Sequence, residues 1–105
     1  MMRKAKVFVN GIEAGILSEI QKGKKYEFEY FQDYHGPEVS RTMLPEKRKY
    51  KFHEFPPFFE GLLPEGVQLE GLLKINKLDR NDLFSQLMAV GNDMVGAVTV
   101  KEMKE

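Results

Sequence analysis

The stretch from Phe55 to Gly66, FPPFFEGLLPEG, constrains the fold more than any other part of the chain. It holds three Phe, two Leu, three Pro and two Gly, so it is too apolar for an ordinary surface loop and too interrupted for one long element. Proline is tolerated at the first helical position because its missing N–H has no partner within the helix there. We therefore predict a short helix that begins at the prolines.

The same stretch predicts a core face followed by an exposed corner. Phe58, Phe59, Leu62 and Leu63 follow the i, i+1, i+4, i+5 spacing that gathers side chains on one face of a helix. A proline comes next, and the residue before a proline is disfavoured in the α region, so the helix ends there. The stiff turn at 64–67 costs little entropy to immobilise against a partner, which makes it our candidate recognition element.

An antiparallel hairpin is predicted at the N-terminus. Asn10-Gly11 lies between two extended segments, 5–9 and 12–17, and Asn-Gly suits a type I′ turn because both of its central residues need positive φ. Gly15, inside the second segment, indicates a bulge or a close approach of another backbone.

A third strand follows a polar turn at 22–25. Tyr26-Glu27-Phe28-Glu29-Tyr30 alternates aromatic and acidic side chains, so the aromatic ones should face the core and the acidic ones water. The pattern weakens over 31–51, where we predict a short extended piece at 43–45, a charged loop or sheet edge at 46–51, and no more than one short strand.

Two further helices and a last strand complete the prediction. Residues 67–78 read as a helix with Gly71 as a weak point, and its apolar positions are Leu69, Leu72, Leu73 and Ile75. Asp79 is predicted to cap the next helix, with Asp82 in its first turn. The core face of that helix comprises Leu83, Phe84, Leu87, Met88 and Val90.

Gly91 is expected to end that last helix as a C′ glycine. Asn92 and Asp93 are predicted turn formers, and 96–100 reads as a strand that pairs within the N-terminal sheet. The polar tail at 101–105 is expected to fray. The predicted fold class is thus α+β, a single domain spanning 1–105 in which a small antiparallel sheet, an N-terminal meander plus the C-terminal strand, packs against three short helices.

Charge and cysteine content exclude several classes of protein. The chain has 16 basic and 16 acidic side chains, so no global field recruits nucleic acid or an anionic membrane. It has no cysteine, which excludes disulfides and thiolate metal sites. Without a signal peptide or a long apolar run, we expect a cytoplasmic protein with no membrane partner.

No arrangement of residues suggests catalysis. The chain lacks a Gly-x-Ser-x-Gly elbow, and Ala97 and Val98 stand where a phosphate loop at 91–98 would need Lys and Ser or Thr. The two histidines, His35 and His53, lack the spacing of metal ligands. We therefore predict no enzyme, no catalytic residue, no metal and no cofactor; a small enzyme remains an alternative that a deep polar pocket would support.

A basic cluster offers a second alternative function. Lys47, Arg48, Lys49 and Lys51 are interleaved with aromatic residues, a pattern that suits contact with a phosphate backbone in a nucleic-acid-binding accessory protein. The simpler interpretation, which we favour, is a solvated edge whose lysines oppose strand-to-strand aggregation. Direct contact with nucleic acid is therefore not expected.

Two motifs about thirty residues apart resemble a known family. Phe58-Phe59-Glu60-Gly61-Leu62-Leu63-Pro64-Glu65-Gly66 and Gly91-Asn92-Asp93-Met94-Val95-Gly96-Ala97-Val98-Thr99-Val100 look like the two signature stretches of the N-terminal subdomain of HipA-family serine/threonine kinases. The resemblance covers nearly the whole chain. HipA-like toxins continue into a kinase core, so at 105 residues the chain resembles the free-standing HipS-like antitoxins of tripartite HipBST toxin–antitoxin systems.

The resemblance implies a partner and a role. The partner would be a HipT-like serine/threonine kinase toxin, with a HipB-like DNA-binding repressor in the same complex, and the chain would neutralise or modulate the kinase. Relatives often carry a bulky aromatic residue where this chain has Val67. A docking scaffold that does not inhibit the kinase is therefore kept as an alternative. The expected partner-binding residues are Phe59, Pro64, Glu65, Gly66, Val67 and Leu69.

Overall fold

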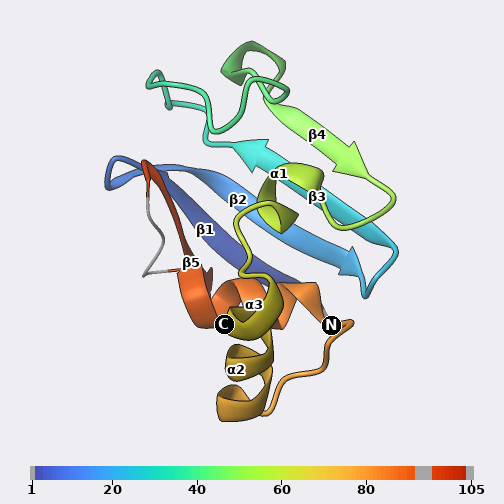
Figure 1. Ribbon diagram of the computed structural model, residues 1–105. Helices are drawn as coiled ribbons and strands as arrows, with labels where there is room; N and C mark the ends of the chain where they lie inside the picture. Colours follow the sequence, from blue (N-terminus) through green and yellow to red (C-terminus); the bar gives the residue numbers. More distant parts are fainter. Residues whose placement is uncertain (1, 92–95, 104–105) are drawn as a thin grey trace.

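All the predicted strands join one antiparallel sheet with helices on one of its faces. The computed structural model describes residues 2–91 and 96–103. Over these residues the order is β1 (Arg3–Val9), β2 (Ile12–Gln21), β3 (Lys25–Tyr30), the 3-10 helix η1 (Pro45–Lys47), β4 (Lys49–Phe52), α1 (Pro57–Glu60), α2 (Gly66–Asn76), α3 (Leu83–Val90) and β5 (Val98–Met103). The strand order is β4-β3-β2-β1-β5 (Figure 1). The predicted α+β class is confirmed.

The N-terminal hairpin forms as predicted. Asn10 and Gly11 have φ of 51° and 80°, as a type I′ turn requires. The β1–β2 register shifts between Val7 and Phe8, opposite Gly15, and an added Cβ at Gly15 would lie 2.4 Å from the carbonyl oxygen of Glu29. Gly15 therefore serves both expected purposes, a bulge and a close backbone approach. The second strand runs to Gln21, beyond the predicted end at residue 17.

The alternation in β3 is also confirmed, and the long connection after it is tied down by side chains. Tyr26, Phe28 and Tyr30 are buried. The Tyr30 hydroxyl accepts from the Val39 N–H at 2.8 Å and donates to the carbonyl of Met43, which lies in the 43–45 piece. That piece makes only an isolated bridge, Ser40 with Met43, before η1 begins. The one short strand expected within 31–51 is β4, an edge strand.

The core lies between the sheet and the helices. Phe59 is fully buried, and its ring centroid lies 6.0 Å from that of Phe28 on the sheet. Phe58, Leu62 and Leu63 are partly buried against the same core, as predicted. However, α1 ends at Glu60, so the two leucines lie in the turn that follows and not on the helix. Phe84 and Leu87 bring α3 onto the core beside β5.

Three details of the helices differ from the predictions. The cap of α3 is Asp82, whose carboxylate accepts from the Ser85 N–H, whereas the Asp79 carboxylate accepts from the Asn81 N–H in the preceding turn. Ile75 is 81% exposed and not part of a core face. Gly91 has φ of −56°, so it is not a left-handed C′ residue. It must be glycine because an added Cβ would lie 2.2 Å from the carbonyl oxygen of Val100.

The C-terminal strand is longer than predicted. Pairing with β1 continues to Met103, opposite Lys4, so 101–103 belongs to the sheet and not to a frayed tail. The expected turn at Asn92 and Asp93 lies outside the described residues.

Candidate docking surface

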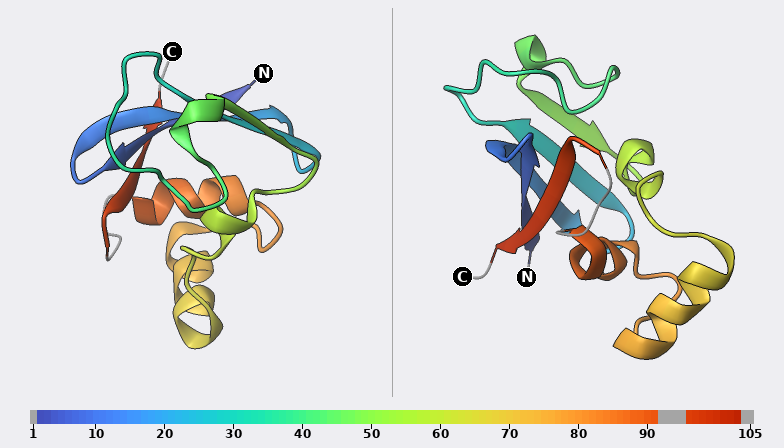
Figure 2. Two further views of the ribbon diagram at one scale, coloured as in Figure 1. Left: turned by 90° about the horizontal axis from the view of Figure 1, so that it is seen from above. Right: turned by 60° about the vertical axis from the view of Figure 1, so that its left-hand side comes forward.

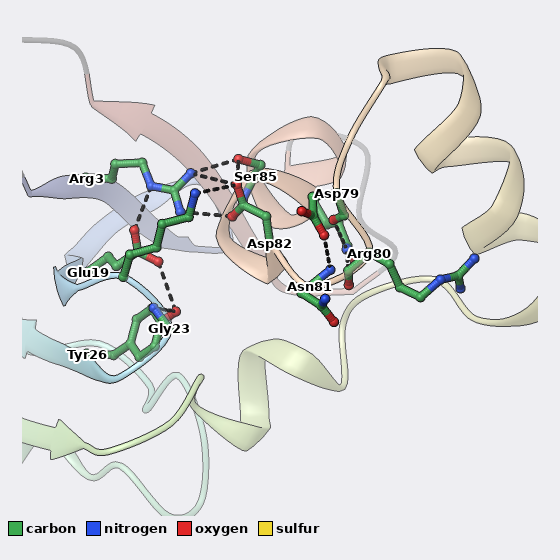
Figure 3. A network of polar contacts seen from close by, with 11 residues as sticks. Arg3, Glu19, Gly23, Tyr26, Asp79, Arg80, Asn81, Asp82 and Ser85 are labelled. Carbon is green, nitrogen blue, oxygen red and sulfur yellow. Dashed lines mark hydrogen bonds and ion pairs between the residues drawn. The ribbon is translucent and has the colours of Figure 1, made fainter.

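No metal-binding cluster is found within the described part of the chain. No group of three or more His, Asp or Glu side chains comes together there in a way that could hold a metal ion. None of the described helices is both long and apolar enough to cross a bilayer. The most connected polar side chains instead form one network that joins the sheet to α3, which Figure 3 shows from close by.

This network is centred on Arg3. Its guanidinium donates to Glu19 at 2.7 Å, to Ser85 at 2.8 Å and to Asp82 at 2.9 Å. The Tyr26 hydroxyl completes the network by donating to Glu19 at 2.9 Å. Each buried acceptor of the network has a donor. The network therefore acts as a structural brace that joins β1, β2 and β3 to the first turn of α3.

The environment of the network shifts three pKa values. Burial alone would lower the pKa of the Arg3 guanidinium, but the hydrogen bonds to Glu19 and Asp82 outweigh it and raise that pKa. Burial alone would raise the pKa of the Asp82 carboxyl, but hydrogen bonds from Arg3 and Ser85 outweigh it and lower the pKa from 3.8 to about 2. Burial, together with the hydrogen bond to Glu19, raises the pKa of Tyr26 to about 12. All three shifts follow from burial and from the contacts of the network that joins the sheet to α3.

The predicted corner, residues 64–67, lies where α1 gives way to α2. The chain turns after Leu63, whose N–H donates to the carbonyl of Glu60 at 3.1 Å. Gly66 begins α2 with φ of +60°, a conformation that glycine adopts without steric cost. Val67 follows it and is 89% exposed. The corner therefore presents a β-branched apolar side chain to solvent on a constrained backbone.

The helix that follows the corner projects from the rest of the molecule (Figures 1 and 2). It contacts α3 along a face where only Leu73 is buried. Val67, Gly71 and Ile75 recur every four residues on the opposite face, and an added Cβ at Gly71 meets nothing within 4 Å. We call these three residues the outer stripe of α2. The stripe thus exposes two apolar side chains, Val67 and Ile75, on a projecting element.

The structure brings together some of the six expected partner-binding residues. Glu65, Gly66 and Val67 are exposed, and Pro64 and Leu69 are half-buried beside them. Phe59 is different: its side chain is fully buried, so it supports the corner from within the core and cannot itself touch a partner. Sequence reasoning missed Gly71 and Ile75. Their spacing, four and eight residues after Val67, places them on one face of the helix, but spacing alone does not say which face has a neighbour.

The basic cluster is less uniform than its sequence indicates. Arg48 is turned inward, and its guanidinium donates to the carbonyls of Phe31 and Tyr34 at 2.8 and 3.0 Å. Lys47 lies over the ring of Tyr50, with its Nζ 5.2 Å from the centroid. Lys49 and Lys51 are exposed on the edge strand. Three of the four cations thus remain at the surface.

Comparisons with known proteins agree with this architecture. The model of the family described as "HipA N-terminal domain" matches residues 5–101. An uncharacterized protein of Haemophilus influenzae is 31% identical over 105 residues, covering 100% of this chain and 97% of that relative. The solved structure of the N-terminal domain of HipA toxin superposes with a TM-score of 0.76 at 29% identity, covering 98% of this chain and 94% of the other. The chain belongs to the HipA N-terminal domain family.

Proposed function

We propose that this protein is a non-catalytic regulatory subunit of a toxin–antitoxin complex. As an antitoxin of HipS type, it binds a HipA-like or HipT-like serine/threonine kinase and neutralises or modulates it. Family membership supports the choice of partner, because the matched solved domain is described as part of a HipA toxin. A relative of nearly the same length, of which 97% is covered, supports a domain that acts as a separate chain.

The observation that carries the proposal is the exposed apolar surface of the corner and α2. Val67 and Ile75 are 89% and 81% exposed on a helix that is held only from its other side. A stable complex buries on the order of 1,200 to 2,000 Å² in total. A projecting helix with a stiff corner can enter a cleft on the kinase with little loss of entropy, because its backbone is already ordered.

In this proposal the corner inhibits by occupying space in the kinase cleft. Val67, the most exposed large apolar side chain of the described residues, leads the contact, and Glu65 lies beside it as an exposed negative charge. The outer stripe of α2 extends the contact along the helix. Occupation of the cleft would prevent its closure or the entry of substrate, and this requires no catalytic residue on the present chain.

The test is to measure binding and kinase activity with variants of this surface. The full chain is titrated into a HipA-type kinase encoded beside it, with calorimetry for affinity and autophosphorylation for activity. Val67→Asp and Ile75→Asp should each weaken binding at least tenfold, because a charge would be buried without a partner. Ile12→Asp is the matched control: Ile12 is a 64% exposed β-branched residue beside the β1–β2 turn.

The outcomes separate the proposal from its alternatives. If the wild-type chain binds tightly but kinase activity is not lost, the chain is a docking scaffold and not an antitoxin. Unchanged binding and inhibition by the Asp variants would remove the corner and the outer stripe from the mechanism. A nucleic-acid accessory would instead show binding of duplex DNA by this chain alone that weakens as salt rises and depends on Lys47, Lys49 and Lys51.

A further inference from the structure

The outer edge of β4 is an open hydrogen-bonding edge. β4 is the last strand on its side of the sheet. Just before it, the Tyr30 N–H donates to the carbonyl of Arg48 at 2.8 Å, which fixes the alternation of the antiparallel pair. Tyr50 and Phe52 therefore direct their backbone groups towards β3, and Lys49 and Lys51 direct theirs away from the sheet. Within residues 2–91 and 96–103, no hydrogen bond is made to those outward groups.

An apolar cavity lies beside this edge. Its volume is about 570 Å³, and its lining joins the apolar Met43, Phe52, Pro56, Pro57 and Phe58 with the polar Thr42, Lys51, His53 and Glu54. A second cavity of about 300 Å³ shares Lys51, Phe52 and His53 with the first. Both volumes are within the range of ligand sites. The open edge is therefore flanked by space that can accept side chains.

The side chains of β4 divide by chemistry between the two faces of the sheet. Lys49 and Lys51 are exposed on the face away from the helices, whereas Tyr50 and Phe52 are half-buried on the helix side. β3 matches this division on the occupied edge, where glutamates oppose the lysines and aromatic residues oppose the aromatics. Its pairs are Tyr26 with Phe52, Glu27 with Lys51, Phe28 with Tyr50, and Glu29 with Lys49.

We propose that β4 binds an extended segment of a partner protein as an added antiparallel strand, and that this segment alternates acidic and large apolar side chains. Its backbone would pair with the free groups of Lys49 and Lys51, as in other cases of strand addition. Its acidic side chains would oppose the two lysines, and its apolar ones would enter the cavity beside Phe52. This site is separate from the corner and does not depend on the kinase proposal.

Charge selects this occupant over a second copy of the chain. If the β4 edges of two copies paired, Lys49 and Lys51 of one would face the same lysines of the other, and like charges directly opposite are destabilising. Lysines on an edge strand are also a common guard against aggregation. If the lysines act only as a guard, no strand binds the edge stably, whereas the proposed site binds an acidic strand, and this difference can be measured.

The probe is a peptide with the sequence of β3, Tyr-Glu-Phe-Glu-Tyr, with blocked termini, titrated into the full ¹⁵N-labelled chain. We expect the amides of Lys49 and Lys51 to shift and to become protected from hydrogen exchange, while those of Tyr50 and Phe52 are protected from the start. The matched control, Tyr-Lys-Phe-Lys-Tyr, keeps the aromatic content and should bind at least tenfold more weakly. A copy of the acidic peptide that is methylated on the backbone nitrogens of its two glutamates, which would face β4, should not bind.

Variants of the edge separate charge from backbone pairing. Lys49→Gln combined with Lys51→Gln removes both charges and should weaken binding of the acidic peptide about fivefold. Lys51→Pro removes an outward N–H as well as the charge, a change that an edge strand tolerates. It should weaken binding of the acidic peptide more than Lys51→Gln alone does. The proposal is overturned if neither peptide binds, if both bind equally, if the methylated peptide binds like the parent, or if the shifts lie on α2.

Discussion

The body of the molecule and its projecting arm treat their apolar side chains in opposite ways. The body, formed by the sheet, α1 and α3, buries Phe28, Phe59 and Phe84 completely and joins its elements through the Arg3 network. The arm, residues 61–76, buries only Leu73 in α2 and leaves Val67 and Ile75 in water. The body therefore supplies stability, and in our proposal the arm supplies the surface that a partner covers.

The largest expected effect is the loss of a core aromatic side chain. Phe59→Ala should lower the free energy of unfolding by about 3–5 kcal/mol, because it leaves a cavity at the contact between α1 and the sheet. Val67→Ala on the arm should leave it unchanged, since that side chain contacts little. Urea unfolding followed by circular dichroism measures both, and equal effects would contradict the division into body and arm.

The Arg3 network provides a second contrast, between a buried and an exposed ion pair. Arg3→Met leaves the buried carboxylate of Glu19 without its cation. It leaves Asp82 with only the more distant Lys22 Nζ, at 3.9 Å, as a cation, so it should cost about 2–3 kcal/mol. Arg80→Met breaks only the exposed pair with Glu70 on the arm and should cause no measurable change. Thermal unfolding of the two variants tests this, and a larger loss of stability in Arg80→Met than in Arg3→Met would contradict it.

The same network predicts how stability depends on acid. The pKa of Asp82 is about 2 in the folded chain against 3.8 ordinarily. Its contribution to the free energy of unfolding is therefore fully present above pH 3.8. The contribution is lost as pH falls from 3.8 through 2 and amounts to about 2 kcal/mol. Unfolding measured from pH 5 to pH 2 should show this loss in wild type, and the loss should be smaller in Asp82→Asn.

The smallest expected effect is a gain of stability in the arm. Gly71 has open space around it and no positive φ, so Gly71→Ala should favour α2 by about 1 kcal/mol. We expect slower hydrogen exchange of the amides of α2, by about fivefold, with little change in β1 and β2. Exchange that slows equally across the sheet would mean that the arm and the body unfold as one unit.

Local patterns in the sequence predicted the body well. Asn10-Gly11 indicated the first hairpin, and the alternation from Tyr26 to Tyr30 indicated which face of β3 is buried; both are confirmed. These predictions succeeded because turn chemistry and a period of two are local properties. The core role of Phe59 followed in the same way from its spacing with Phe58, Leu62 and Leu63.

Tertiary contacts decided what the sequence could not predict. Asp79 and Asp82 are equally good caps by residue type, and the contact of Asp82 with Arg3, far away in sequence, accompanies its role as the cap of α3. Gly91 is required by the approach of Val100 and not by a helix ending. Ile75 was assigned to a core because apolar spacing alone does not say which face of a helix has a neighbour.

The most direct test of the docking account is hydrogen exchange of the full chain, alone and mixed with the proposed partner, a HipA-type kinase. The account predicts strong protection on binding at the corner, 64–67, and along α2 to Asn76, with little change in the β1–β2 hairpin. A complex whose protection lies elsewhere, with exchange at the corner and α2 unchanged, would contradict it.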